Sequence, residues 1–198
     1  MDRVNGYLRR VPVWLVYTVG VLPVPIWLWL GINGQLGIDP VKEIEHRLGE
    51  LALQILLVCL AITPLRRYAR LNLMKFRRAI GVLAFYYVTC HLLVWLVLDV
   101  QIPAQIWADI LKRPYVTIGM AAFALLLPLA VTSNNWSVRR LGNAWRRLHR
   151  LVYPAVLLGA IHYLMLVKGF QFEPLIYLGM ILLLLGLRLP DLRRRTAL

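Results

Sequence analysis

The sequence predicts an all-α membrane protein, a bundle of six transmembrane helices that forms a single domain over residues 1–198. The first observation is composition, because 60% of the 198 residues are hydrophobic, whereas the apolar share of a soluble domain is nearer 45–50%. The second is that these residues gather into six runs, each near the roughly 20 residues that cross a bilayer. The third is that charge, Gly or Pro bounds every run. The runs cover residues 13–31, 48–63, 79–98, 115–132, 151–167 and 174–189.

The first run begins shortly after the Arg9–Arg10 pair, a position that a signal peptide also occupies. Its apolar stretch is long and no small-residue cleavage pattern follows it, so we interpret it as a retained helix. Prolines at positions 23, 25, 128 and 154 fall inside or near the runs. Neighbouring groups in a bundle satisfy the carbonyls that a proline frees, so these positions predict kinks within continuing helices.

The distribution of charge predicts the orientation of the bundle. The formal net charge is +14, and the basic residues fall in short blocks between the apolar runs. One side of the membrane receives 18 of the 23 Lys and Arg residues, from segments 3–10, 66–78, 139–150 and 188–195. The other side receives seven of the nine acidic residues. The positive-inside rule then places both termini in the cytoplasm. The positive charge does not predict nucleic-acid binding, because a helical bundle surrounded by lipid has no surface on which a nucleic-acid duplex could bind.

The histidines are the main candidates for binding chemistry. The two cysteines, Cys59 and Cys90, lie inside apolar runs and suggest neither a disulfide framework nor a cysteine metal site. His91 in the third run and His162 in the fifth lie at matching depth on helices that run in the same direction. Two imidazoles placed in this way suit a bis-histidine haem b. The alternatives are separate core histidines bonded to carbonyls or hydroxyls, a proton relay, or another metal.

His149 is the candidate ligand of a second haem. It precedes His162 by 13 residues, which is a rise of ~20 Å and about the separation of two haems in opposite leaflets. On a straight α-helix the two side chains point ~140° apart. Pro154 lies between them, and a kink there would bring both toward one seam.

A partner for His149 is expected at the start of the third helix, where residues 75–78 contain no histidine. A second haem therefore has one histidine and a different sixth ligand, or His149 only bonds to a propionate or another cofactor. Arg77 and Arg78, with Arg146 and Arg147, suit propionate carboxylates. The alternative is that these arginines serve only as topology charges.

His46 lies in the polar segment 39–49, on the side opposite His149. We expect an ordinary surface or helix-start histidine. Partner docking, contact with a quinone and support of an outer haem are the alternatives.

The chain resembles the MsrQ (YedZ) family, which belongs to the ferric reductase-like transmembrane group. The resemblance covers nearly the whole chain, with its motifs in order. They are DPVKEIEHRLG (39–49), ITPLRRYAR (62–70), the third run with His91, RPYVTIG (113–119), TS (132–133), RRLGNAWRRLHRLVY (139–153) and IHY (161–163).

The resemblance implies a haem-binding subunit of a periplasmic methionine sulfoxide reductase system in the bacterial inner membrane. His91, His149 and His162 match the family's histidines, which implies one or two b-type haems. Electrons are expected from the quinone pool or a cytoplasmic flavin reductase, and a periplasmic molybdopterin subunit is expected to reduce the sulfoxide. FMN is implied by the resemblance alone. A stand-alone ferric or oxygen reductase is the alternative function, and a haem-free scaffold or small transporter is a third.

Two departures from the related NADPH oxidases qualify these expectations. The third run holds only His91, whereas the oxidases carry two histidines on each haem helix. About nine residues follow the last run, and no GxGxxG nucleotide fingerprint is present. We therefore expect a separate electron donor.

Overall fold

The computed structural model of the chain describes residues 1–167, 169 and 171–188. Over these residues the regular structure is helical, with no strand. Within the same part of the chain, five helical segments are long and apolar enough to cross a membrane, and a sixth apolar helix is shorter. The five are Val13–Ile32, Pro40–Tyr68, Met74–Val100, Pro114–Val131 and Asn143–Leu166, and the shorter one is Phe172–Gly186. The chain is thus a multi-pass helical membrane protein.

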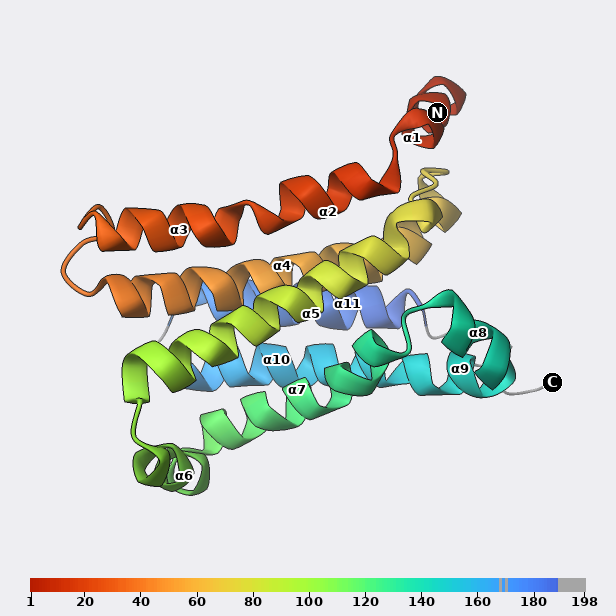
Figure 1. Cartoon of the computed structure of the whole chain (residues 1–198). Helices are drawn as coiled ribbons and strands as arrows, with labels where there is room; N and C mark the ends of the chain where they lie inside the picture. The colour runs from red at the N-terminus through yellow and green to blue at the C-terminus, as the bar shows by residue number, and fades with distance from the viewer. Residues whose placement is uncertain (168, 170, 189–198) are drawn as a thin grey trace.

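The first span consists of two short helices. It follows helix α1 (Asp2–Arg10) and divides into α2 (Val13–Val21) and α3 (Pro23–Ile32). Prolines 23 and 25 lack the N–H groups that would continue the ladder of α2, which explains the division. Figure 1 shows α2 and α3 along one side of the bundle, where α2 contacts α5 and α3 contacts α4.

Helix α4 (Pro40–Tyr68) is longer than the predicted run 48–63, because its start is well capped. The side chain of Asp39 accepts the backbone N–H of Lys42 at 3.2 Å, and Pro40 occupies the first turn. That N–H also lowers the pKa of the Asp39 carboxyl below its ordinary value. Most of the segment 39–49, expected as an outer polar segment, is therefore the first part of a transmembrane helix.

The remaining elements follow the order of the predicted runs, with short surface helices between them. They are η1 (Met74–Phe76), α5 (Arg77–Val94), η2 (Trp95–Val100), α6 (Pro103–Lys112), α7 (Pro114–Val131), α8 (Asn135–Leu141), α9 (Asn143–Leu148), η3 (His149–Leu151), α10 (Val152–Leu166) and α11 (Phe172–Gly186). The last residue of the predicted run 174–189 lies outside the described residues. Lys168 and Arg193–Arg195, which were counted among the charges, also lie outside them.

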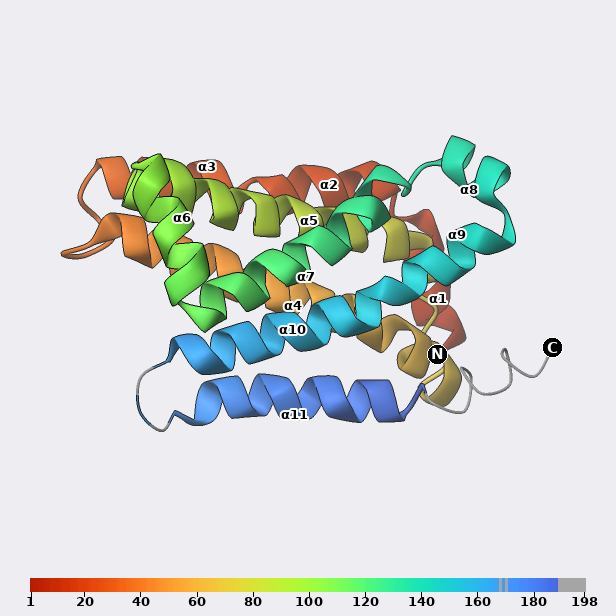
Figure 2. The ribbon, with the colours of Figure 1, turned by 90° about the horizontal axis from the view of Figure 1, so that it is seen from below.

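Four helices form two pairs that enclose the middle of the bundle. Helix α4 packs along α5, and α7 packs along α10, with α11 covering α10 and α4 (Figures 1 and 2). The main core joins these helices through buried side chains such as Leu56, Ala84, Leu126 and Val156. The two pairs thus meet in this core.

The bundle has two chemically different ends. Helix α1, the arginines between α4 and α5, and helices α8 and α9 lie at one end, which we call the basic end (Figure 1). The turn between α3 and α4 and helix α6 lie at the other, which we call the opposite end (Figure 1). Arg188, expected among the tail charges, is instead 3% exposed and packed against α4. The separation of charge agrees with the predicted orientation, which stays a prediction.

Candidate haem site

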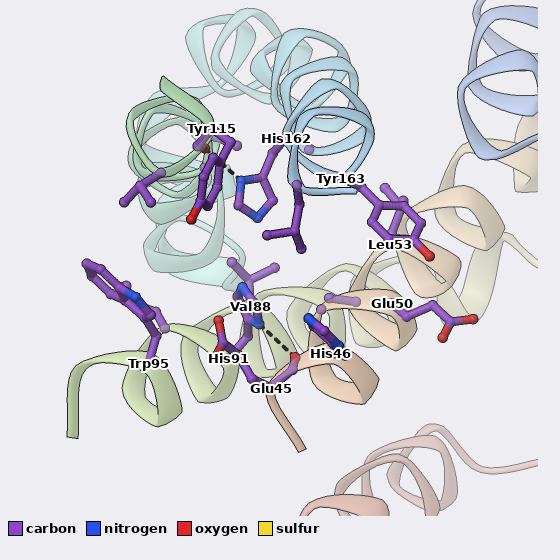
Figure 3. Close-up of a pocket in the computed structure, with 18 of the residues that line it drawn as sticks. Glu45, His46, Glu50, Leu53, Val88, His91, Trp95, Tyr115, His162 and Tyr163 are labelled. Atoms are coloured by element: carbon purple, nitrogen blue, oxygen red, sulfur yellow. Dashed lines mark hydrogen bonds between the residues drawn. The ribbon is translucent and has the colours of Figure 1, made fainter. Parts of the chain in front are cut away.

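His91 and His162 face each other from different helix pairs. His91 extends from α5 and His162 from α10, and their ring centres lie 6.2 Å apart with the ring planes at 78°. Both line a cavity of about 770 Å³ between the α4–α5 pair and the α7–α10 pair. Figure 3 shows the two rings entering this cavity from opposite sides. The structure therefore brings together the two histidines that matching depth singled out.

The spacing of the rings fits a metal held between them. Two metal–nitrogen bonds of about 2.0–2.1 Å, plus about 1.2 Å from each nitrogen to its ring centre, would separate the centres by at most about 6.4–6.6 Å. The observed separation is 6.2 Å. A direct hydrogen bond between the rings would bring their centres closer together, and a larger gap would leave one ligand out of reach, whereas edge-to-face contact also covers this separation. The two imidazoles present are thus a pair of residues that would hold the iron of one porphyrin.

Hydrogen bonds fix which nitrogen of each ring points into the cavity. Nδ1 of His91 lies 2.9 Å from the backbone oxygen of Glu45, and Nδ1 of His162 lies 2.7 Å from that of Tyr115. A carbonyl oxygen only accepts, so each Nδ1 carries the proton and donates it. Each Nε2 is then the unprotonated nitrogen, the form in which imidazole binds a metal.

The cavity has apolar walls of a size suited to a small organic cofactor, within the usual 300–1,000 Å³. Leucines, aromatic residues and small residues from all four helices form these walls. They include Leu53, Leu56, Val88, Leu92, Trp95, Val116, Met120, Ala122, Phe123, Leu126 and Ala155. Such a surface suits the flat apolar faces of a porphyrin and keeps water from the two imidazoles.

The charged residues that line the cavity lie toward the opposite end, and we call this part of the lining the mouth. They carry both signs of charge and include Lys42, Arg47 and Arg113, together with Glu43, Glu45 and Asp99. Arg113 donates to the hydroxyl of Tyr115 at 3.3 Å, and its Nε lies 3.2 Å from Asp109. The hydrogen bond to Tyr115 is the main reason that the pKa of Arg113 is raised above its ordinary value. Arg113 therefore stays positively charged beside the hydroxyl of Tyr115.

Two residues of this site were missed from the sequence, and a third has an additional place in it. His46 is exposed near the start of α4, as expected of a surface or helix-start histidine, and it also lines the cavity on the side of His91 (Figure 3). Gly49 and Gly119 also line it, each against one of the two imidazoles. In the sequence, each glycine comes four residues after the residue whose carbonyl accepts the proton of an imidazole. This spacing could not identify the glycines beforehand, because only the structure shows which carbonyls accept these protons.

His149 lies apart from the ring pair. It begins η3 near the basic end, where its ring stacks on Trp145 with centres 3.8 Å apart. Nδ1 lies 3.1 Å from the Trp145 oxygen, and Nε2 lies 3.5 Å from Oγ of Ser133. Among the described residues that line the 770 Å³ cavity, His149 is absent. Its role as a second haem ligand stays a prediction.

Arg77 and Arg78 also lie outside the lining of this cavity, within the part of the chain that the structure describes. They begin α5, at the basic end. Arg78 donates to the side-chain oxygen of Asn135 at 2.6 Å, and the backbone oxygen of Arg77 lies 4.0 Å from Sγ of Cys59. The ring pair and these two arginines are thus at different ends, and propionate binding by Arg77 and Arg78 stays a prediction.

Comparison with known proteins finds relatives of this chain. Residues 47–160 match the model of the family described as the ferric reductase like transmembrane component. The chain is also 49% identical over 185 residues to proteins of Brucella ovis, Brucella canis and Brucella abortus. Each of the three is named protein-methionine-sulfoxide reductase heme-binding subunit MsrQ, and each match covers 92% of this chain and 84% of the relative.

Proposed function

Because the chain belongs to the MsrQ family of ferric reductase-like transmembrane proteins, we propose that it is the haem b-binding, electron-transferring subunit of a methionine sulfoxide reductase system. The name of the relatives, heme-binding subunit, supports the class of function. The observation that carries the proposal is the His91–His162 pair, with ring centres 6.2 Å apart across a cavity of about 770 Å³.

The residues of the cavity have separate tasks in this proposal. His91 and His162 are the iron ligands, and haem, when bound, supplies reversible one-electron chemistry. The carbonyls of Glu45 and Tyr115 hold the two Nδ1 protons and so keep each Nε2 directed into the cavity. The apolar walls exclude water. Basic side chains at the mouth, Arg113 among them, are the groups suited to the carboxylates of a porphyrin.

The partners are proposed from the family resemblance and the two ends of the bundle. In the bacterial inner membrane, the basic end faces the cytoplasm and the cavity mouth faces the periplasm. The electron donor is the quinone pool or a cytoplasmic flavin reductase. The acceptor is a periplasmic molybdopterin-containing subunit, which itself reduces methionine sulfoxide in oxidised proteins. FMN remains a proposal from the resemblance, and we assign no described residue to it.

Haem content of purified variants tests the ligand pair. We expect His91→Ala and His162→Ala each to lose most of the haem that the parent protein binds, as measured by pyridine haemochrome per polypeptide. Each change leaves the iron with one ligand and the other imidazole facing an apolar cavity. Thr89→Ala is the matched control, because the Thr89 hydroxyl bonds only to Phe85 of its own helix, at 2.8 Å. Parent-like haem content in both histidine variants would contradict the proposal.

A second measurement tests the proposed acceptor. Protein reduced in proteoliposomes should be reoxidised when the periplasmic subunit and methionine sulfoxide are both supplied, and slowly when either is omitted. Rapid reoxidation by a ferric chelate or oxygen alone, with no response to the periplasmic subunit, would instead favour a stand-alone reductase.

A further inference from the structure

Gly49 supports the ring of His91 from the neighbouring helix. It lies on α4, four residues after Glu45, whose backbone oxygen accepts the Nδ1–H of His91 at 2.9 Å. A Cβ added to Gly49 would lie 3.1 Å from Nδ1 and 3.2 Å from Cε1 of His91. These are tighter separations than ordinary van der Waals contact, which begins at about 3.5 Å between carbon atoms. The ring therefore lies directly on the bare backbone of α4.

Gly119 stands in the same relation to His162. It lies on α7, four residues after Tyr115, whose backbone oxygen accepts the Nδ1–H of His162 at 2.7 Å. A Cβ at position 119 would lie 2.9 Å from Nδ1 and 3.0 Å from Cε1 of that ring. Two helices far apart in sequence thus present the same arrangement, a carbonyl and a glycine four residues later, to two different imidazoles.

The spacing has a geometric cause. Residues four apart share one face of an α-helix, and each backbone carbonyl points toward the residue four positions ahead. A side chain on that residue would stand beside the carbonyl and hold an incoming ring away from it. Glycine removes this obstacle, so the imidazole reaches the oxygen while its flat edge rests on the helix.

We propose that Gly49 and Gly119 are positioning residues of the haem site, each fixing the orientation of one axial histidine. The inference rests on the proposed haem function and adds what sets the ring orientations. The carbonyl and glycine that contact His91 lie on α4, and those that contact His162 lie on α7, so each ring is oriented independently. The 78° angle between the ring planes results from the two orientations together. An alanine at either position forces its ring to shift by several tenths of an ångström, to rotate, or to lose its bond to the carbonyl.

The test compares alanine variants of the full-length protein in detergent, loaded with haem. We expect Gly49→Ala and Gly119→Ala to release haem to apomyoglobin at least about 10-fold faster than the parent, the lower end of the usual effect of groups that orient metal ligands. Their low-spin ferric EPR spectra should also change, because those spectra depend on the angle between the axial ring planes. The effect should be larger at Gly119, where the added Cβ is closer to the ring.

Gly81→Ala is the matched control. Gly81 lies on α5 with His91, but a Cβ there would meet only Sγ of Cys59, at 4.0 Å. We expect parent-like haem release and an unchanged EPR spectrum. Parent-like behaviour of both Gly49→Ala and Gly119→Ala would overturn the inference.

A detached ligand separates positioning from general packing. In a His91→Gly background supplied with imidazole, the replacement ring is not tethered to α5 and adjusts freely. Adding Gly49→Ala should then change haem release less than twofold, whereas adding Gly119→Ala should still accelerate it, because His162 remains tethered. If Gly49→Ala alone does not fold, recovery of folding in this background supports the inference. A Gly49→Ala defect that persists there overturns it.

These outcomes are distinct from failure of the proposed function. A parent protein that binds no haem, or a His91→Ala variant with parent-like haem content, would refute the haem ligation itself. A haem-loaded parent with insensitive glycine variants would refute only the positioning role.

Discussion

At the scale of single residues, His91 and His149 make the same kind of backbone contact in different surroundings. Each has Nδ1 within hydrogen-bond distance of a carbonyl, at 2.9 Å for His91 and 3.1 Å for His149. His91 faces a second imidazole across an apolar cavity, whereas the ring of His149 is covered by Trp145 and its Nε2 faces the hydroxyl of Ser133. In the described surroundings of His149, both ring nitrogens therefore lie near protein partners, and its role as a second haem ligand stays a prediction.

Haem stoichiometry of a His149→Ala variant tests this distinction. We expect the haem-to-polypeptide ratio to equal that of the parent, because the ring pair at the other end is untouched. Pyridine haemochrome with quantitative amino-acid analysis measures the ratio. A value that falls by about half would instead assign a second haem to His149, with a sixth ligand other than histidine.

The histidine pair was predictable because the depth of a residue in the membrane follows from its position along its own helix. His91 and His162 lie at matching depth because both helices run in the same direction, and the lateral packing of the helices does not change this depth. The clearances at Gly49 and Gly119 were not predictable, because each depends on how closely a second helix approaches. The angular relation of His149 to His162 stays a prediction. It assumes a straight α-helix, whereas His149 begins the 3₁₀ turn η3.

At the scale of helices, a buried arginine compensates for a proline in α4. Pro64 has no N–H to donate to the backbone oxygen of Leu60, four residues earlier. The guanidinium of Arg188, just after α11, donates to that oxygen and to the oxygen of Cys59 at 3.4 Å. Tyr153 accepts a further bond from Arg188 at 3.4 Å. The bond that α4 lacks is thus supplied by another part of the chain.

Replacement of this arginine should destabilise the bundle. We expect Arg188→Leu to lower the thermal unfolding midpoint in detergent, because an unpaired buried carbonyl costs about 1–3 kcal/mol. Combining it with Pro64→Ala, which restores an N–H for Leu60, should recover part of the loss. Arg140→Leu, an exposed change on α8, is the control and should have little effect. Strictly additive losses in the double variant would refute the compensation.

The extents of the helices were harder to predict than their existence. Run 48–63 was identified from apolar residues alone, yet α4 begins at Pro40, because Asp39 caps it and its charged first turns face the cavity mouth. Polar residues in a transmembrane helix that borders a cavity resemble a loop in sequence. The place of His46 in the cavity lining follows from this early start of α4.

At the scale of the whole molecule, the ring pair and the arginine-rich segments occupy different ends. The cavity mouth lies beside the turn before α4 and near α6, while α1, α8 and α9 lie at the basic end (Figure 1). Helix α11 has only 15 residues, about 22 Å of rise, but it lies alongside α10 and ends toward the end where α1 lies (Figure 2). This arrangement is the one expected if six helices return the chain to its starting side.

Two exposed tryptophans allow the orientation to be tested with a matched pair of sites. Trp107 on α6 and Trp136 on α8 are each 64% exposed, and they lie at opposite ends of the bundle. In a variant whose native thiols, Cys59 and Cys90, are replaced by alanine, we introduce Trp107→Cys or Trp136→Cys separately. The excess of basic residues at the α8 end should hold that end in the cytoplasm. A membrane-impermeant maleimide should therefore label residue 107 in spheroplasts, and residue 136 only after the membrane is opened. The reverse pattern would place the cavity mouth in the cytoplasm, where a periplasmic acceptor could not reach it, and would refute the proposed direction of electron flow while leaving the histidine pair intact.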